Sequence, residues 1–202
     1  MTAIDHVHPI SHREALLQEG MAQIFANGYH GTTVDGLLKA TGVPKGSFYH
    51  HFGSKEALTE KILNRYGGFH RNLLASWAER DLPTPAVLSG YFRELARIVV
   101  ESGYRQGELA GKLATEIVDP ADPLHQQIAE IVRQWRAQLE KILRVGQRRG
   151  DTRTDRDAQA LSAWLHALMD GAFVVAQSTR DADSLESVAT AIEHLIAVQA
   201  VG

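Results

Sequence analysis

Apolar residues recur every three or four positions along most of the chain, which is the spacing of an amphipathic α-helix. One such stripe falls within residues 17–25, and a longer one falls within residues 128–142. Strand-like alternation is scarce, and segments rich in Pro, Gly or Asp, such as "DLPTP", "VDPADP" and "RRGDTRTD", separate the stripes. The pattern predicts an all-α protein with nine helices.

The predicted helices fall into two groups. The first helix begins at a capping box, Ser11 with Glu14, and is expected to end at Asn27-Gly28. Two short helices follow, and Ser54 is placed to cap a long fourth helix that runs to about Arg80. We therefore expect one domain over residues 1–53 and a larger helical domain over residues 54–202.

The segment "TTVDGLLKATGVPKGSFYHHFGSKEAL", residues 32–58, breaks one short helix and starts another almost at once. Gly42 permits a sharp turn, and Pro44 suits the first position of the next helix. Two short helices joined by a tight turn form a helix-turn-helix, whose second helix enters the major groove of DNA. This segment therefore predicts a DNA-binding element.

Small and polar residues cluster at the start of the second helix of this pair. Gly46 lets the backbone approach DNA closely, hydroxyl and imidazole groups can donate to phosphate oxygens, and Lys45 can reach a phosphate or a guanine edge. Residues at helix N-termini also favour phosphate. The candidate DNA-binding residues are Thr33, Lys45, Gly46, Ser47, Tyr49, His50, His51 and Lys55.

Charge alone does not indicate a nucleic-acid partner. The formal net charge is −3, and acidic residues balance the basic ones through Tyr66. The segment before the first helix carries His6, His8, His12 and Arg13 in place of a lysine-rich arm. The DNA-binding prediction therefore depends on where the charges lie and not on how many there are.

The stretch "GYHGTTVDGLLKATGVPKGSFYHHFGSKEAL", residues 28–58, resembles the tetracycline-repressor (TetR) family of bacterial regulators nearly without interruption. The resemblance implies a three-helix DNA-binding domain, a helical ligand-binding and dimerisation domain, and a homodimer on a palindromic operator in double-stranded DNA. It also implies that the eight candidate residues contact DNA. The expected function is a repressor that an unknown small-molecule effector releases from its operator.

Other interpretations stay open from the residues themselves. A glycine-turned helix pair can be a plain helical hairpin in a bundle, and His51 can equally be a packed histidine between the domains. The runner-up function is a ligand-binding helical protein of the same fold that does not bind DNA. An enzyme is the weaker alternative, because the chain carries no glycine-rich phosphate loop, nucleophile elbow or H-E-x-x-H motif.

The eighth predicted helix, about residues 157–177, is apolar on two sides. One stripe runs through Leu161, Leu165 and Leu168, and the other through Trp164, Ala167 and Gly171. One side can pack within its own subunit while the other meets a partner, although a fully internal helix in a monomer is the alternative. The predicted dimer interface comprises Leu161, Trp164, Leu165, Leu168, Ala172, Val175, Ile192 and Leu195.

Large side chains gather in the second domain, where the resemblance implies a small-molecule cavity. The predicted ligand-binding residues are Trp77, Tyr91, Tyr104, Trp135, Met169 and Phe173, each of which can instead be ordinary core. Residues 104–143 also resemble a branch whose sixth helix opens with a cysteine-containing run. Here Glu108 stands at the cysteine position, and the chain has no cysteine, so thiol-based sensing is excluded.

Several negative expectations complete the prediction. With no thiolates, a metal would need a set such as His6, His8 and His12, which lacks an acidic companion, so neither a metal nor a cofactor is expected. No apolar stretch approaches the roughly 20 residues of a membrane span. The start of the chain lacks the pattern of a secretory signal, so a cytoplasmic location is expected.

Overall fold

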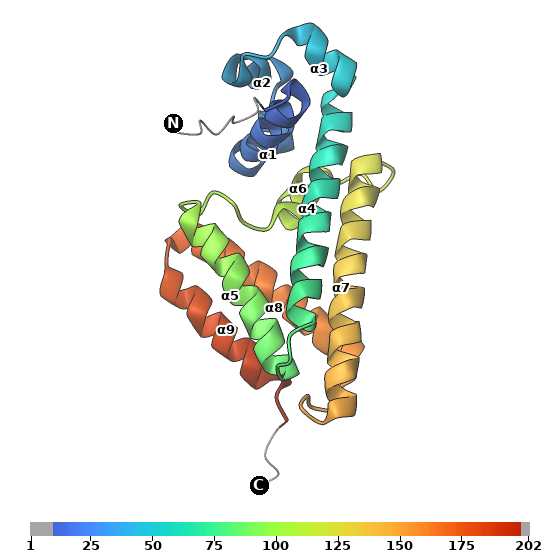
Figure 1. The fold of residues 1–202 in the computed structure, drawn as a ribbon, viewed down its shortest axis with the longest axis vertical. Coiled ribbons are helices and arrows are strands. Elements are labelled where there is room, and N and C mark those ends of the chain that lie inside the picture. Colours follow the sequence, from blue (N-terminus) through green and yellow to red (C-terminus); the bar gives the residue numbers. More distant parts are fainter. Residues whose placement is uncertain (1–9, 199–202) are drawn as a thin grey trace, which may run out of the picture. The chain divides into compact units, whose positions relative to one another are not determined.

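The computed structural model describes residues 10–198, and within them it contains nine α-helices and no strand. The all-α prediction is confirmed. Figure 1 shows the helices in chain order. Their bounds are α1 His12–Gly31, α2 Val34–Thr41, α3 Lys45–His51, α4 Lys55–Ala78, α5 Thr84–Glu101, α6 Leu109–Glu116, α7 Pro123–Arg149, α8 Ala158–Thr179 and α9 Ala182–Ile196.

The chain divides into two compact units, Met1–Ile62 and Leu63–Gly202. We call the first unit the head and the second unit the body. The division falls inside α4, so this helix belongs in part to each unit. The predicted boundary after residue 53 falls in the loop that precedes α4 and remains a prediction.

The head is built around its first helix. The Ser11 hydroxyl accepts a hydrogen bond from the Glu14 amide at 3.2 Å, as the capping box predicts. The expected end at Asn27-Gly28 is only partly correct. Gly28 does leave helical geometry, with φ 75° and ψ −179°, but the helix resumes and continues to Gly31. A residue with a side chain is rarely found at such a positive φ, which explains why glycine stands at this kink.

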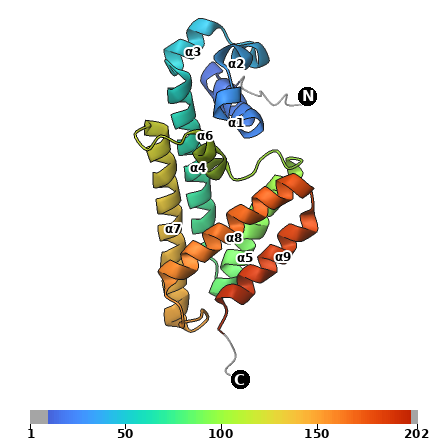
Figure 2. The same ribbon diagram turned by 180° about the vertical axis from the view of Figure 1, so that it is seen from behind.

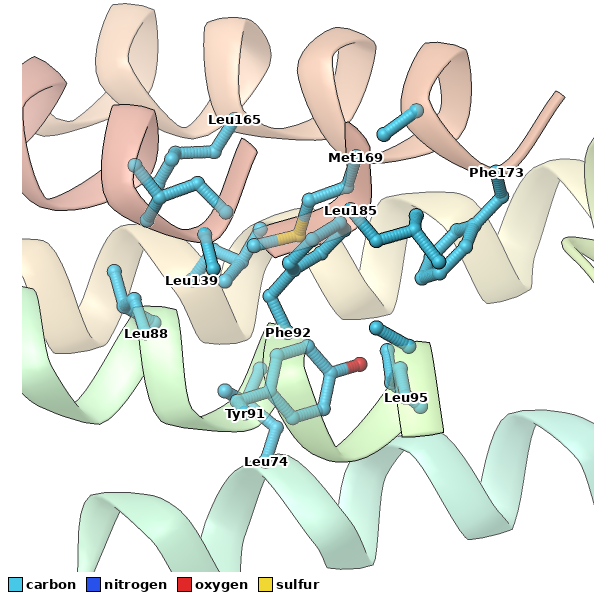
Figure 3. Packing of buried hydrophobic residues seen from close by; sticks show 14 of the residues in the cluster. Leu74, Leu88, Tyr91, Phe92, Leu95, Leu139, Leu165, Met169, Phe173 and Leu185 are labelled. Atoms are coloured by element: carbon cyan, nitrogen blue, oxygen red, sulfur yellow. The ribbon is translucent and has the colours of Figure 1, made fainter. Parts of the chain in front are cut away.

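The body packs α5, α7, α8 and α9 with the second part of α4 around one core. Figures 1 and 2 show α5 and α9 side by side, with α8 crossing behind α5 in Figure 1 and in front of it in Figure 2. In the interior, the rings of Phe92 and Phe173 stack with their centroids 5.1 Å apart (Figure 3). Leu139, Leu165 and Met169 fill the space around them, all essentially inaccessible to solvent.

None of the helices in residues 10–198 is long and apolar enough to cross a membrane.

Candidate DNA-binding surface and ligand pocket

Helix α2 has a side-chain cap at its start and a glycine at its end, where the turn to α3 begins. The Thr33 hydroxyl caps α2 by accepting a hydrogen bond from the Gly36 amide at 3.0 Å. Gly42 ends α2 in the left-handed region, with φ 68° and ψ 8°, where L-residues are strained. Pro44 is the N-cap of α3 and not its first residue, which is Lys45. The turn thus aims α3 away from the direction of α2.

Helix α3 has one buried face and one exposed face. Phe48 is completely buried, and Phe52 and Val43 next to α3 are buried as well. The neighbouring Tyr49 leaves 48% of its surface exposed. The exposed residues of α3 are Lys45, Gly46, Tyr49, His50 and His51, with Ser47 half-buried. Burial of Phe48 therefore determines which side chains α3 presents to solvent.

Two polar contacts lie on the exposed side of α3. Lys45 Nζ lies 3.9 Å from Asp35, and both side chains are largely exposed. His12 Nδ1 and the Ser47 hydroxyl are 3.1 Å apart, which joins the start of α1 to α3. A Cβ added to Gly46 would meet nothing within 4 Å, so a surface of another molecule can approach the backbone there.

Lys55 has a structural role in the head. Its Nζ donates to the carbonyl oxygens of Tyr29 at 2.9 Å and Thr32 at 3.1 Å. It also lies 4.1 Å from the centroid of the Tyr29 ring, a cation–π distance. The ammonium group therefore stabilises the carbonyl end of α1, and its predicted contact with phosphate remains a prediction.

The body contains a cavity to which five helices contribute. It encloses about 30 Å³ of free space, enough for about two water molecules. A larger ligand must therefore displace some of the lining side chains. The cavity is lined by Tyr66, Gly67, His70, Arg71, Leu95, Glu108, Ala110, Ile131, Val132, Trp135, His166, Met169, Asp170 and Phe173. We call this cavity the ligand pocket.

Half of the predicted ligand-binding set lines the pocket: Trp135, Met169 and Phe173. Trp77 does not, because its indole packs over Gly90 on α5 and donates to Glu94 at 2.7 Å. Tyr104 is also absent from the lining and packs against the edge of the core. These two residues belong to the packing of the body, the alternative that the sequence left open for each of them.

Tyr91 lies one layer behind the pocket wall. The Trp135 indole donates to the Tyr91 hydroxyl oxygen at 3.0 Å, and the same hydroxyl lies 3.0 Å from His70 Nδ1. The hydroxyl can donate to Nδ1 or accept from it, and which of the two occurs depends on the tautomer of the His70 ring. Burial lowers the pKa of His70 from 6.5 to about 4, in agreement with a neutral ring.

Glu108 carries a carboxylate into the pocket at the start of α6. One oxygen accepts from the Tyr66 hydroxyl, and the other caps α6 by accepting from the Gly111 amide. Burial, and then the charge of Asp170, raise the pKa of Glu108 above its ordinary value. Burial likewise raises the pKa of Tyr66, with Glu108 adding to the effect. The Tyr66 hydroxyl therefore stays protonated and donates.

A second carboxylate reaches the pocket from α8. Asp170 lies 2.7 Å from His166 Nε2, one helical turn away. The other ring nitrogen, Nδ1, is buried and has no hydrogen-bond partner in the protein. The His166 ring meets Trp135 edge to face, with centroids 5.0 Å apart. Unpartnered buried nitrogens are uncommon in folded proteins.

The sequence did not identify Tyr66, His70, His166 and Asp170 as pocket residues. A signal existed for the last two, since a His and an Asp four residues apart stand out in an otherwise apolar helix. Tyr66 and His70 share the same spacing on α4, but that helix has many polar residues, so the pair does not stand out. Glu108 was named only as the residue that stands at the cysteine position of the similar branch.

Of the three histidines considered as a possible metal-binding set, His6 and His8 lie outside the described residues. Within residues 10–198 the structure holds no group of three or more His, Asp or Glu side chains arranged to bind a metal ion.

The structure buries part of the predicted dimer interface within the protomer and leaves the rest exposed. Leu161 and Leu165 are fully buried in the protomer, as is Ile192 of α9, and Ala172 is 8% exposed. These four residues pack in the protomer's own core and have no surface left for a partner. Leu168 and Leu195 are half-buried. The exposed apolar surface of α8 is made of Trp164, Ala167, Gly171, Val174 and Val175.

A helix-turn-helix with an exposed polar recognition face, together with a helical body that contains a pocket, defines a ligand-responsive DNA-binding regulator. Two family models agree with this class. The model for bacterial regulatory proteins of the tetR family matches residues 16–62, and the model for the tetracyclin repressor-like C-terminal domain matches residues 86–192. The chain belongs to the TetR family of bacterial regulatory proteins.

Similar proteins include other regulators of the same kind. The chain is 28% identical over 181 residues to the transcriptional repressor DhaR of Mycobacterium sp. (strain GP1), with 89% of each chain covered. It is 28% identical over 190 residues to the transcriptional repressor NemR of Escherichia coli (strain K12), covering 94% of this chain and 96% of NemR.

Solved structures give the same picture. The crystal structure of reduced E. coli NemR superposes with a TM-score of 0.83, covering 94% of this chain and 98% of that chain at 28% identity. The crystal structure of a TetR regulatory protein from Rhodobacter sphaeroides also reaches 0.83, at 26% identity. The relatives are transcriptional regulators, which are not enzymes, and members of the family bind DNA and act as dimers. The protein is a ligand-responsive, DNA-binding transcriptional repressor, and a protein that does not bind DNA is not favoured.

Proposed function

We propose that this repressor acts as a homodimer on a palindromic operator and leaves it when a small-molecule effector occupies the ligand pocket. The observation that carries the proposal is the division of α3 into a buried face at Phe48 and an exposed polar face at Lys45 and Tyr49. Two such helices, one from each protomer, would enter adjacent major grooves roughly 34–36 Å apart.

In this proposal the exposed residues of α3 have distinct roles. Lys45 supplies the one long cation of α3, and its 3.9 Å contact with Asp35 is weak enough to be exchanged for a phosphate or a guanine. Tyr49, His50 and His51 donate to phosphate oxygens. Gly46 permits close approach of the backbone, while Thr33 and Ser47 complete the phosphate contacts at the helix starts.

Fluorescence anisotropy on DNA from upstream of the protein's own gene tests this assignment. Wild type should bind an inverted repeat with an affinity that falls steeply with salt, because phosphate contacts release counterions. Lys45→Ala/Tyr49→Ala should lose binding by about a hundredfold, equivalent to about 2.7 kcal/mol. Lys141→Ala, which removes one exposed cation from α7, is the control and should bind as wild type does. Equal binding by all three proteins would refute the assigned DNA surface.

The dimer interface is proposed to be the exposed stripe of α8, with α9 beside it. Val174 and Val175 leave 60% and 52% of their surfaces exposed, and Trp164 leaves 42%. Large apolar side chains grouped along one helix face are typical of protein–protein interfaces.

Sedimentation velocity of Val174→Arg distinguishes this stripe from an ordinary exposed surface. A buried, unpaired charge at the interface should convert dimers into monomers. Val118→Arg is the matched control, because Val118 is also apolar and 69% exposed but lies after α6. If both variants stay dimeric, the interface is elsewhere.

Effector and DNA are proposed to favour different conformations of the dimer, with α4 carrying the change since it runs from head to body. Coupling between two binding sites is reciprocal, so operator DNA should weaken effector binding by the same factor as effector weakens DNA binding. Calorimetric titration of effector with and without operator measures that factor. Identical effector affinities in the two titrations would refute the coupling.

A further inference from the structure

Acidic side chains dominate the charge of the ligand pocket. Its charged and titratable side chains are Glu108, Asp170, His70, His166 and Arg71, together with the Tyr66 phenol. Glu108 and Asp170 come from different helices and lie close enough for the charge of Asp170 to disfavour ionisation of Glu108. Two carboxyl groups therefore face one small cavity.

The basic groups of the pocket do not neutralise both carboxyl groups. His70 is held neutral, because burial lowers its pKa to about 4, and its Nδ1 already shares a hydrogen bond with the Tyr91 hydroxyl. Arg71 is exposed and donates to Gln134 on α7 at 3.1 Å. His166 is already paired with Asp170 at 2.7 Å. Glu108 accepts hydrogen bonds from neutral groups, the Tyr66 hydroxyl and the Gly111 amide.

Aromatic side chains form much of the remaining wall. Tyr66, Trp135 and Phe173 line the pocket from α4, α7 and α8. The faces of aromatic rings attract cations, most strongly where water is excluded, and they also bury the apolar part of an organic ligand. Carboxylates beside aromatic faces are the combination that suits a positively charged organic group.

We propose that the effector is a small organic cation, whose ammonium group binds between Glu108 and Asp170 while its apolar part packs against Trp135 and Phe173. The proposal rests on the proposed function of the pocket as the effector site. An anionic ligand would face two carboxyl groups there, and a neutral ligand would leave their mutual repulsion unrelieved.

The same geometry connects the cation to the DNA-binding head. An ammonium group that donates to Glu108 competes with the Tyr66 hydroxyl for the same oxygen. Tyr66 lies on α4, the helix that continues into the head. Loss of its bond to Glu108 removes one restraint that holds α4 in the effector-free conformation.

Three water-soluble probes with one phenyl ring each test the charge preference: benzylammonium, benzyl alcohol and phenylacetate. Calorimetric titration of the full chain should give the tightest binding for the ammonium compound. Asp170→Asn and Glu108→Gln should each weaken it by about tenfold, since a hydrogen bond or contact to a charged group contributes about 1.5 kcal/mol or more. Affinity for benzyl alcohol should change less than about twofold. Asp170→Asn keeps a side-chain oxygen for His166 and so remains informative if Glu108→Gln disturbs α6.

Glu130→Gln is the control, because it removes a carboxylate from the exposed surface of α7. It should leave all three affinities unchanged. The proposal is overturned if phenylacetate or benzyl alcohol binds as tightly as the ammonium compound, if neither pocket variant weakens the ammonium compound, or if that compound does not bind at millimolar concentration. Operator binding is measured in parallel by anisotropy. Loss of wild-type operator binding would refute the proposed repressor function, while the calorimetry would still decide the ligand class.

Discussion

The head and the body present their chemistry in opposite ways. In the head, one continuous segment carries the side chains proposed to contact DNA, and most of those on α3 are exposed to solvent. In the body, five helices contribute to the pocket, and its polar groups are satisfied mainly by one another, as in the chain from His70 through Tyr91 to Trp135. The head can therefore contact a large rigid partner without rearrangement.

The pocket has a different relation to its ligand. With about 30 Å³ of free space, it must change its packing to admit anything larger than water. Met169, an unbranched side chain at the pocket wall, is suited to such a change (Figure 3). An exposed surface in the head and a pocket that must repack in the body together suit a regulator. A ligand that alters packing in the body can favour one conformation of the protein over another.

The largest expected effect is a difference in stability between variants of two neighbouring residues of α3. Phe48→Ala should destabilise the head by about 3–5 kcal/mol, because it leaves a cavity where a fully buried ring stood. Tyr49→Ala should change the free energy of unfolding by less than about 1 kcal/mol, since nearly half of this side chain is exposed. Urea denaturation followed by circular dichroism measures both values. Similar losses of stability in the two variants would contradict the division of α3 into a core face and a DNA face.

The next effect is a pH dependence in the body. Because the pKa of His70 is lowered from 6.5 to about 4, the unfolded chain binds the proton more readily than the folded protein does. The contribution of the neutral ring is complete above pH 6.5 and is lost as the pH falls toward 4. Between pH 7.5 and pH 5.0 this residue should cost about 2 kcal/mol of stability.

His70→Gln isolates that contribution, since glutamine does not titrate and its amide oxygen can accept from Tyr91. Urea denaturation at both pH values should show a smaller loss of stability on acidification in the variant than in wild type. Equal losses in the two proteins would mean that His70 is not held neutral by burial.

A smaller effect tests the position of Trp77, which packs in the body and not in the pocket. A Cβ at Gly90 would come within 2.1 Å of the Trp77 ring. Overpacking costs about 1–3 kcal/mol, and the better helix propensity of alanine offsets about 1 kcal/mol of it, so Gly90→Ala should destabilise by about 1 kcal/mol. In Gly68→Ala, whose Cβ would meet only Arg71 at 3.8 Å, stability should rise by up to about 1 kcal/mol. Thermal denaturation compares the pair, and a Gly90→Ala protein as stable as Gly68→Ala would place Trp77 elsewhere.

The difference between head and body also explains what could be predicted from the sequence. The helix-turn-helix depends on contacts between residues a few positions apart, such as Thr33 with Gly36 and the turn at Gly42, and these were recognisable in one short segment. The pocket depends on which helices meet. Tyr66 and Glu108 are 42 residues apart, and no local pattern connects them.

The dimer interface on helix α8 likewise could not be predicted in full from the local sequence pattern. Its periodicity predicts two apolar stripes, but the exposed side of the helix also takes in Val175 from the first of them. Which stripe is covered within the protomer depends on the core that α5, α7 and α9 build, and the core covers the side of Leu161 and Leu165. Trp164 lies on the exposed side of α8, and 42% of its surface is accessible to solvent.

The smallest expected effect returns to the head and separates DNA affinity from stability. Asp35 and Lys45 lie 3.9 Å apart with side chains 87% and 66% exposed, so their attraction contributes less than about 1 kcal/mol to folding. Asp35→Asn should hardly change the urea midpoint. It should nevertheless raise DNA affinity a few-fold at low salt, because it removes a negative charge close to the phosphates and leaves Lys45 free to bind one. Anisotropy at several salt concentrations measures this gain, which should shrink as salt screens the charges. An unchanged affinity at low salt would mean that the Asp35–Lys45 side of the head does not face the DNA backbone, and the assignment of Lys45 would then have to be abandoned first.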